Sequence, residues 1–152
     1  MFFFIKCVNQ GLKVRLYPDE DMVNKINQNI GNSRFTWNKL LEYYKETYKL
    51  FKLHGYSKLK CNMTTFNAML NMLKKEHDFL YLSESSTLQQ VYRDLIHAYN
   101  KFFSGEGAYP RFKSKNHDKK SFRIQNNGNI KIKDNMIILP KLGEVYCRSA
   151  TS

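Results

Sequence analysis

The sequence predicts an α+β fold in which a helical region is inserted into a small, incomplete β-barrel. Residues 11–18, GLKVRLYP, alternate apolar and basic side chains, as a half-buried strand does. From residue 19 to residue 104 apolar side chains recur at three- and four-residue spacing, which indicates helices. Beyond Gly107 the period returns to two, so the first strand can join the last strands in one barrel.

The first helix is expected to begin directly after Pro18, where three carboxylates suit the positive end of a helix dipole. The stretch is expected to form a helix or a helix pair, and Gly31-Asn32 is the predicted break. The expected apolar face comprises Val23, Ile26, Ile30, Trp37, Leu41, Tyr44, Tyr48 and Phe51. We expect Trp37 to be a core residue, with a base-stacking platform as the alternative.

Two more helices follow. One begins near Thr64 or Thr65 and has Lys74 and Lys75 in its last turn, where cations suit the negative end of the dipole. The next begins within the serine cluster 83–86, and its apolar face continues until Ser104-Gly105 ends it. Ser86 and Gln89 have the spacing of a capping box at the start of this helix.

The C-terminal part predicts four short strands in meander order. Residues 122–124 lead to a turn at Asn127-Gly128, and the following strands cover 130–133, 136–140 and 144–148. The turns between the last three are expected at Asp134-Asn135 and at residues 141–143.

The charge of the chain points to polyanions. Its 152 residues carry 25 Lys and Arg against 13 Asp and Glu, a net charge of +12. Nucleic acid is the first candidate partner and an anionic membrane the second. The apolar start MFFFI is shorter than the roughly seven to fifteen residues of a signal peptide, so we expect a cytoplasmic protein without a membrane span.

The basic stretch between residues 109 and 133 is the main candidate binding region. Eight cations and one carboxylate, Asp118, give it a net charge of +7. These cations are Arg111, Lys113, Lys115, Lys119, Lys120, Arg123, Lys131 and Lys133. Such a strip binds phosphate backbone without sequence preference, while Tyr109 or Phe112 could stack on an unpaired base. The alternative is that Phe112 and Phe122 pack under the loop and the lysines are solvated.

A second candidate binding site lies at the start of the helix that begins within the serine cluster 83–86. Ser85 and Ser86 could bind a phosphate together with backbone N–H groups, and Gln89 is long enough to reach a base edge. Simple capping of the helix is the alternative interpretation.

Catalysis is not predicted. The carboxylates either suit a helix start or stand singly, and the histidines have no partner at catalytic or metal-ligand spacing. Cys7, Cys61 and Cys147 are far apart, which predicts reduced thiols rather than a zinc site. We therefore expect no catalytic residues, no metal, no cofactor and no small-molecule substrate.

The order of several segments resembles one family, the transposon-encoded TnpB (OrfB) proteins, relatives of type V CRISPR effectors. The segments are RLYP (15–18), the run at 30–44, the run at 79–103, YPRFKSK (109–115) and ILPKLGEV (138–145). The resemblance covers residues 12 to about 148. It implies a first barrel strand at 12–18, a helical recognition or helix-turn-helix region at 19–104, and a basic loop and meander of an oligonucleotide-binding barrel at 105–148.

The resemblance also implies the partners, which are a guide RNA from the transposon end and a target DNA. In this family DNA is cut by a later nuclease region with an Asp/Glu/Asp metal site, so we expect a truncated member that binds without cleavage. Gln89 matches a position that contacts target-DNA bases, whereas Ser85 stands where some members have Lys. Asn126 and Asn127 align roughly with another DNA-reading loop, although a hairpin turn already explains Asn127.

Two other functions stay open at this point. The chain could be a non-functional remnant that folds poorly because apolar strand edges are exposed. It could instead be a basic module that binds a membrane or an acidic protein, although its cations cluster in a loop and strands rather than on one amphipathic helix.

Overall fold

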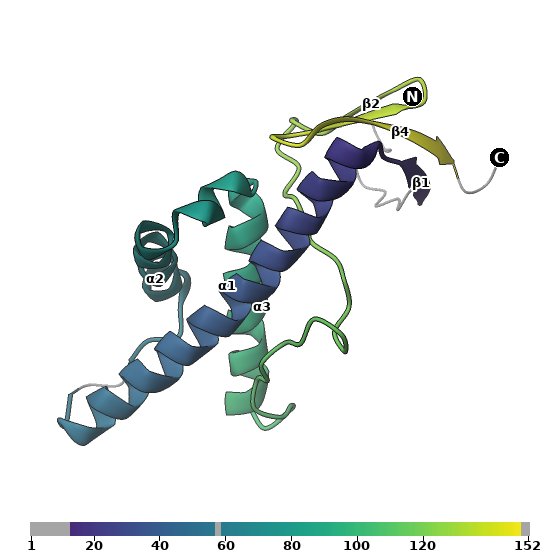
Figure 1. Cartoon of the computed structure of the whole chain (residues 1–152). Coiled ribbons are helices and arrows are strands. Elements are labelled where there is room, and N and C mark those ends of the chain that lie inside the picture. Colours follow the sequence, from purple (N-terminus) through teal and green to yellow (C-terminus); the bar gives the residue numbers. More distant parts are fainter. Residues whose placement is uncertain (1–12, 57–58, 150–152) are drawn as a thin grey trace.

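The computed structural model describes residues 13–56 and 59–149, and it confirms the α+β class. Three helices form a bundle, and a sheet lies at the N-terminal end of the longest one (Figure 1). The elements are β1 (Val14–Tyr17), α1 (Glu20–Leu53), α2 (Met63–Glu76), the 3₁₀ helix η2 (Asp78–Leu82), α3 (Ser85–Phe103), β2 (Lys131–Lys133), β3 (Met136–Leu139) and β4 (Gly143–Ser149). Residue 12 and Cys7, both named above, lie outside the described residues.

The sheet joins the first strand of the chain to the last. Its four strands are antiparallel in the order β1-β4-β3-β2, and Leu16 is paired with Cys147. Both predicted turns within the meander are present, with Asp134 and Lys141 in the left-handed region at φ 55° and 67°. The described strands form an open sheet with β1 and β2 at its edges, so closure into a barrel is not confirmed.

The predicted strand at 122–124 is wrong, because this segment has no ladder partner. Phe122 and Ile124 instead pack their side chains against the apolar layer beneath the sheet. The Gln125 N–H donates to the Ser86 hydroxyl, at 3.0 Å, rather than to a strand. Alternation of apolar residues here reflects contact with the sheet, not membership of it.

Helix α1 is one continuous helix of 34 residues, so the predicted break at Gly31-Asn32 is wrong. Asn32 is buried, and its Nδ2 donates to the Ser83 hydroxyl at 2.8 Å and to the Phe79 carbonyl at 3.3 Å. These tertiary bonds satisfy a side chain that would otherwise compete with the helix backbone. The predicted start is confirmed, since the Asp19 carboxylate accepts from the Met22 N–H at 2.7 Å.

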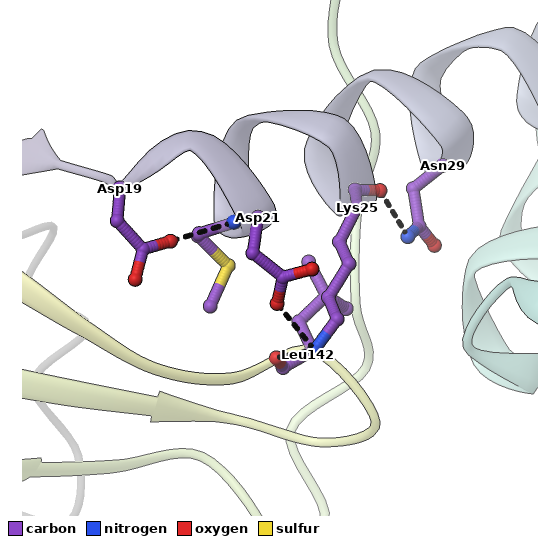
Figure 2. A network of polar contacts seen from close by, with 6 residues as sticks. Asp19, Asp21, Lys25, Asn29 and Leu142 are labelled. Carbon is purple, nitrogen blue, oxygen red and sulfur yellow. Dashed lines mark hydrogen bonds and ion pairs between the residues drawn. The ribbon is translucent and has the colours of Figure 1, made fainter.

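The first turns of α1 are fixed to the β3–β4 turn, as Figure 2 shows. The Lys25 ammonium lies 3.2 Å from the Asp21 carboxylate and donates to the Leu142 carbonyl at 3.4 Å. One turn further on, the Asn29 amide donates to the Lys25 carbonyl at 2.9 Å. Apolar contact between Met22, Leu142 and neighbouring side chains forms a small core beneath the sheet.

A larger core lies within the helical bundle. Its fully buried members include Leu40, Phe66, Leu88 and Leu95. Tyr44 and Tyr99 are also buried, 4.7 Å apart between ring centroids, and burial raises the pKa of both phenols. On the predicted α1 face Trp37, Leu41 and Tyr44 are buried as expected, whereas Val23 and Tyr48 are exposed.

The ends of the other helices agree in part with the sequence. Helix α2 begins at Met63, one or two residues before the predicted start, because the Asn62 side chain caps it by accepting from the Thr65 N–H. Helix α3 ends at Ser104-Gly105 as predicted, but its cap is Glu84 rather than Ser86. Among the described residues, Cys61 and Cys147 are not joined in a disulfide.

Candidate nucleic-acid interface

The basic segment, residues 109–125, runs from the end of α3 back to the sheet, beside α1 and α3, without regular secondary structure and with one turn at 115–117 (Figure 1). Its first residue is attached to α3. The Tyr109 hydroxyl lies 3.1 Å from the Tyr99 hydroxyl, and its ring meets the Phe102 ring edge-on at 5.0 Å between centroids. The Tyr109 ring therefore has intramolecular partners on α3, which a base would have to share.

Helix α1 fixes the middle of the basic segment through its backbone. The Trp37 indole N–H donates to the Arg111 carbonyl at 2.8 Å. Asn38 makes two bonds to Lys113, accepting from its N–H at 2.7 Å and donating to its carbonyl at 2.9 Å. The Lys113 ammonium lies 4.1 Å from the centroid of the Trp37 ring. Trp37 is buried, as predicted, and it also positions two of the predicted site residues.

The last residues of the basic segment are attached to α3 and to the sheet. Arg123 forms an ion pair with Asp94. Phe122 packs beneath the sheet, which agrees with the packing alternative for this aromatic residue. Phe112 differs, because 56% of its surface is exposed. Of the two phenylalanines, Phe112 is therefore the more accessible for stacking, since Phe122 is half-buried.

A cleft of about 300 Å³ lies between the basic segment, α1 and α3. The charged residues that line it are five cations, Arg34, Lys113, Lys119, Lys120 and Arg123, and two carboxylates, Asp94 and Asp118, which gives +3. Asp94 is paired with Arg123, and the Asp118 carboxylate accepts from the Ser114 N–H. The cleft can therefore attract a phosphate group, with Lys119 and Lys120 exposed at its surface.

The start of α3 differs from the predicted phosphate site. The Glu84 carboxylate is buried there and accepts from the Thr87 N–H at 2.9 Å and from the Ser86 hydroxyl. A carboxylate in this position already occupies the positive end of the helix and disfavours a second anion. Ser86 thus has a structural role, while Ser85 is exposed and Gln89 half-buried one turn further on. A direct base contact by Gln89 stays a prediction.

The structure divides the remaining predicted residues between two surfaces. Lys115 is exposed near the cleft but does not line it. Lys131 and Lys133 lie on β2, on the outer face of the sheet, and also do not line the cleft. Asn126 forms a local turn, since its Oδ1 accepts from the Gly128 N–H at 3.0 Å. This agrees with the turn interpretation of Asn127-Gly128, although residues 122–124 form no hairpin strand before it.

Sequence reasoning missed Arg34, Asn38 and Asp94 as parts of this region. Arg34 and Asp94 line the cleft, and Asn38 positions Lys113. Arg34 and Asn38 are one helical turn apart on α1, on the side where Trp37 also contacts the basic segment. A polar stripe beside a buried Trp was the available signal, but its partner is 75 residues away in sequence.

Within residues 13–56 and 59–149, no group of three or more His, Cys, Asp or Glu side chains is arranged to bind a metal ion. Of the helices in the same ranges, none combines the length and apolar character that a membrane crossing requires.

A basic cleft on a helical scaffold is typical of a nucleic-acid-binding protein, and the comparisons with known proteins agree. Residues 7–52 match the helix-turn-helix domain family of IS605 OrfB proteins. In the described part of this range the structure has β1 and one uninterrupted helix, α1.

Two curated proteins are similar to the chain. A Streptomyces pristinaespiralis protein named "Putative RNA-guided DNA endonuclease" is 30% identical over 110 residues, 71% of this chain and 26% of that protein. "Putative RNA-guided DNA endonuclease InsQ" of Escherichia coli K12 is 28% identical over 142 residues, 93% of this chain and 34% of that protein. The match thus spans between a quarter and about a third of these relatives.

The chain is a nucleic-acid-binding, transposase-related protein, and it belongs to the TnpB/OrfB family. This confirms the family predicted from the order of its motifs.

Proposed function

We propose that this chain binds a guide RNA and a target DNA for an RNA-guided DNA endonuclease and does not itself cleave DNA. In this proposal residues 19–104 form the recognition region, and residues 12–18 and 105–148 contribute one wall of an oligonucleotide-binding barrel. The expected location of the complex is the cytoplasm, and we expect no membrane or small-molecule partner.

The arrangement of the basic segment carries this proposal. Its backbone is fixed mainly by neutral groups, the Trp37 indole and the Asn38 amide. The ammonium groups of Lys119 and Lys120 are therefore not needed to hold the segment in place. Cations fixed beside a cleft neutralise phosphates at a low cost in ordering, and each contact releases condensed counterions.

The names of the two relatives support the choice of ligands. Both are named as RNA-guided DNA endonucleases, which act with RNA and on DNA. Since the match spans only part of either relative, we assign binding to the matched region and cleavage to residues that the match does not cover.

The test is the salt dependence of binding, measured by fluorescence anisotropy with a transposon-end RNA hairpin and with duplex DNA. The variant is Lys119→Ala/Lys120→Ala, and the matched control is Lys45→Ala/Lys49→Ala, which removes two exposed lysines from α1. If both cleft lysines contact phosphates, the slope of log K against log salt for duplex DNA falls in magnitude by about 1.8. We expect little change in this slope for the control.

Equal slopes for the two double variants would contradict a specific role for the cleft, because they would reflect net charge alone. Absence of RNA and DNA binding by the folded wild-type chain at low salt would contradict the proposal as a whole. Cleavage of DNA by the purified chain in the presence of Mg²⁺ would contradict the assignment of binding without catalysis.

A further inference from the structure

The outer face of the sheet carries a second group of aromatic and cationic side chains, away from the cleft. The strand register places Lys133, Met136, Tyr146 and Tyr17 in one row across β2, β3, β4 and β1. Arg15 is paired with Arg148. Each arginine is two residues from one of the tyrosines along its strand, so this pair lies on the same face, in the next row. This set, together with Lys131 and Glu144, is called the outer platform below.

The opposite face of the same strands is apolar, and it is covered except at the β2 edge, where Ile132 is exposed. Leu16, Val145 and Ile137 alternate with the residues of the outer platform and pack on α1 beneath the sheet. The sheet therefore packs on α1 through this apolar face. The residues of the outer platform do not take part in that packing, so their side chains are available to bind a ligand.

The two tyrosines of the outer platform form an accessible aromatic pair. Their ring centroids are 5.9 Å apart at an interplanar angle of 61°, and Tyr17 and Tyr146 are 43% and 38% exposed. The guanidinium groups of Arg15 and Arg148 lie 5.6 Å and 5.9 Å from the centroid of the Tyr17 ring. A side-chain hydrogen bond to Tyr146 raises the pKa of Arg148.

The charge of the outer platform matches a phosphate backbone. Four cations, Arg15, Arg148, Lys131 and Lys133, are exposed there against Glu144. Exposed aromatic rings flanked by such cations are the combination that binds single-stranded nucleic acid, because bases stack on the rings while the cations contact the backbone. A duplex offers no free base face to stack, so the fitting ligand has unpaired nucleotides.

We propose that the outer platform binds unpaired nucleotides of an RNA, with bases stacked on Tyr17 and Tyr146 and phosphates contacted by Arg15 and Arg148. This inference rests on the proposed function, because the guide RNA is the ligand there that has unpaired loops. Target DNA enters as a duplex whose bases are already stacked, which suits the cleft instead. The outer platform then selects unpaired nucleotides, while the cleft contacts the phosphate backbone of either nucleic acid.

The test compares three oligonucleotide ligands with one stem sequence: an RNA hairpin with an unpaired loop, a blunt RNA duplex without the loop, and a DNA hairpin with the same loop. The main variant is Tyr17→Leu/Tyr146→Leu, and Tyr17→Phe/Tyr146→Phe is the control that keeps both rings. We expect the leucine pair to weaken binding of the looped RNA by about 5- to 150-fold for each stacked base. Binding of the blunt duplex should be unchanged, and the phenylalanine pair should bind like the wild type.

A thermal melt monitored by circular dichroism establishes that each variant is folded. If the leucine pair does not fold, Arg15→Gln/Arg148→Gln takes its place, and it should weaken binding of the looped RNA more than that of the blunt duplex. Lys119→Ala/Lys120→Ala should weaken both RNAs, because it acts at the cleft.

The outcomes separate this inference from the proposed function. If the wild type binds RNA and the cleft variant weakens it, but the folded leucine pair binds looped RNA like the wild type, only the outer platform is refuted. If the wild type binds the looped DNA as tightly as the looped RNA, and the leucine pair weakens both equally, RNA is refuted as the occupant. If the wild type binds no nucleic acid, both proposals are overturned.

Discussion

Replacing Asn38 by Ala should release the centre of the basic segment while the helices stay folded. Asn38 accepts from the Lys113 N–H at 2.7 Å and donates to its carbonyl at 2.9 Å. Each such bond contributes about 0.5 to 1.5 kcal/mol net. Water can replace part of this loss because Lys113 is exposed, and Ala is the better helix former by up to about 0.7 kcal/mol. We therefore expect a loss near the lower end, about 1 kcal/mol, and a Tm lower by about 2 to 4 °C.

Amide hydrogen exchange measured by NMR is the decisive assay. The Lys113 amide should exchange faster in Asn38→Ala, whereas amides in the buried middle of α3 should keep their protection. Asn24→Ala, at an exposed position of the same helix, controls for the difference in helix propensity. Unchanged exchange at Lys113, or equal acceleration in α3, would refute the argument that Asn38 positions this segment.

Two other contacts lead to predictions of their own. Glu84→Ala removes the cap of α3, where the carboxylate accepts from the Thr87 N–H, and should lower the free energy of unfolding by about 0.5 to 2 kcal/mol in a urea titration; an unchanged midpoint would contradict this role. The hydrogen bond to Glu76 raises the pKa of Tyr43 from 10.0 to about 12. The pKa of Tyr43 is higher in the folded state than in the unfolded state. Its contribution to the free energy of unfolding is therefore complete below pH 10 and is lost as the pH rises through about 12. In an ultraviolet titration Glu76→Gln should bring the pKa of Tyr43 back towards 10.0, and an unaltered titration would show that Glu76 is not the cause.

The sequence predicted those features that depend on neighbouring residues. The Asp19 cap, the lysines in the last turn of α2 and the end of α3 at Gly105 all follow from local backbone chemistry. The meander turns at Asp134 and Lys141 were found for the same reason. Local signals failed where a distant contact outweighed them. A Gly in a helix costs about 1 kcal/mol relative to Ala, which the contacts along the 34 residues of α1 readily offset.

The candidate site shows the same division. The list of cations in the basic stretch came from the sequence, but not the fact that they lie on two surfaces. Strand register places Lys131 and Lys133 on the same face of the sheet as Tyr146 and Tyr17, whereas Lys119 and Lys120 lie at the cleft because Trp37 and Asn38 fix the segment before them. The hydrogen bonds of Trp37 and Asn38 join residues 74 and 75 positions apart, and no local pattern encodes them.

By itself the amino-acid sequence determined the α+β class, the family, the positive charge and most helix ends, since periodicity, charge and capping act over a few residues. Only the tertiary structure decided that α1 is unbroken, that residues 122–124 leave the sheet, that Glu84 rather than Ser86 caps α3, and which cations share a surface. The reason is that these outcomes depend on contacts between segments far apart in the chain. The free energy of such contacts exceeds the local preferences that a sequence pattern displays.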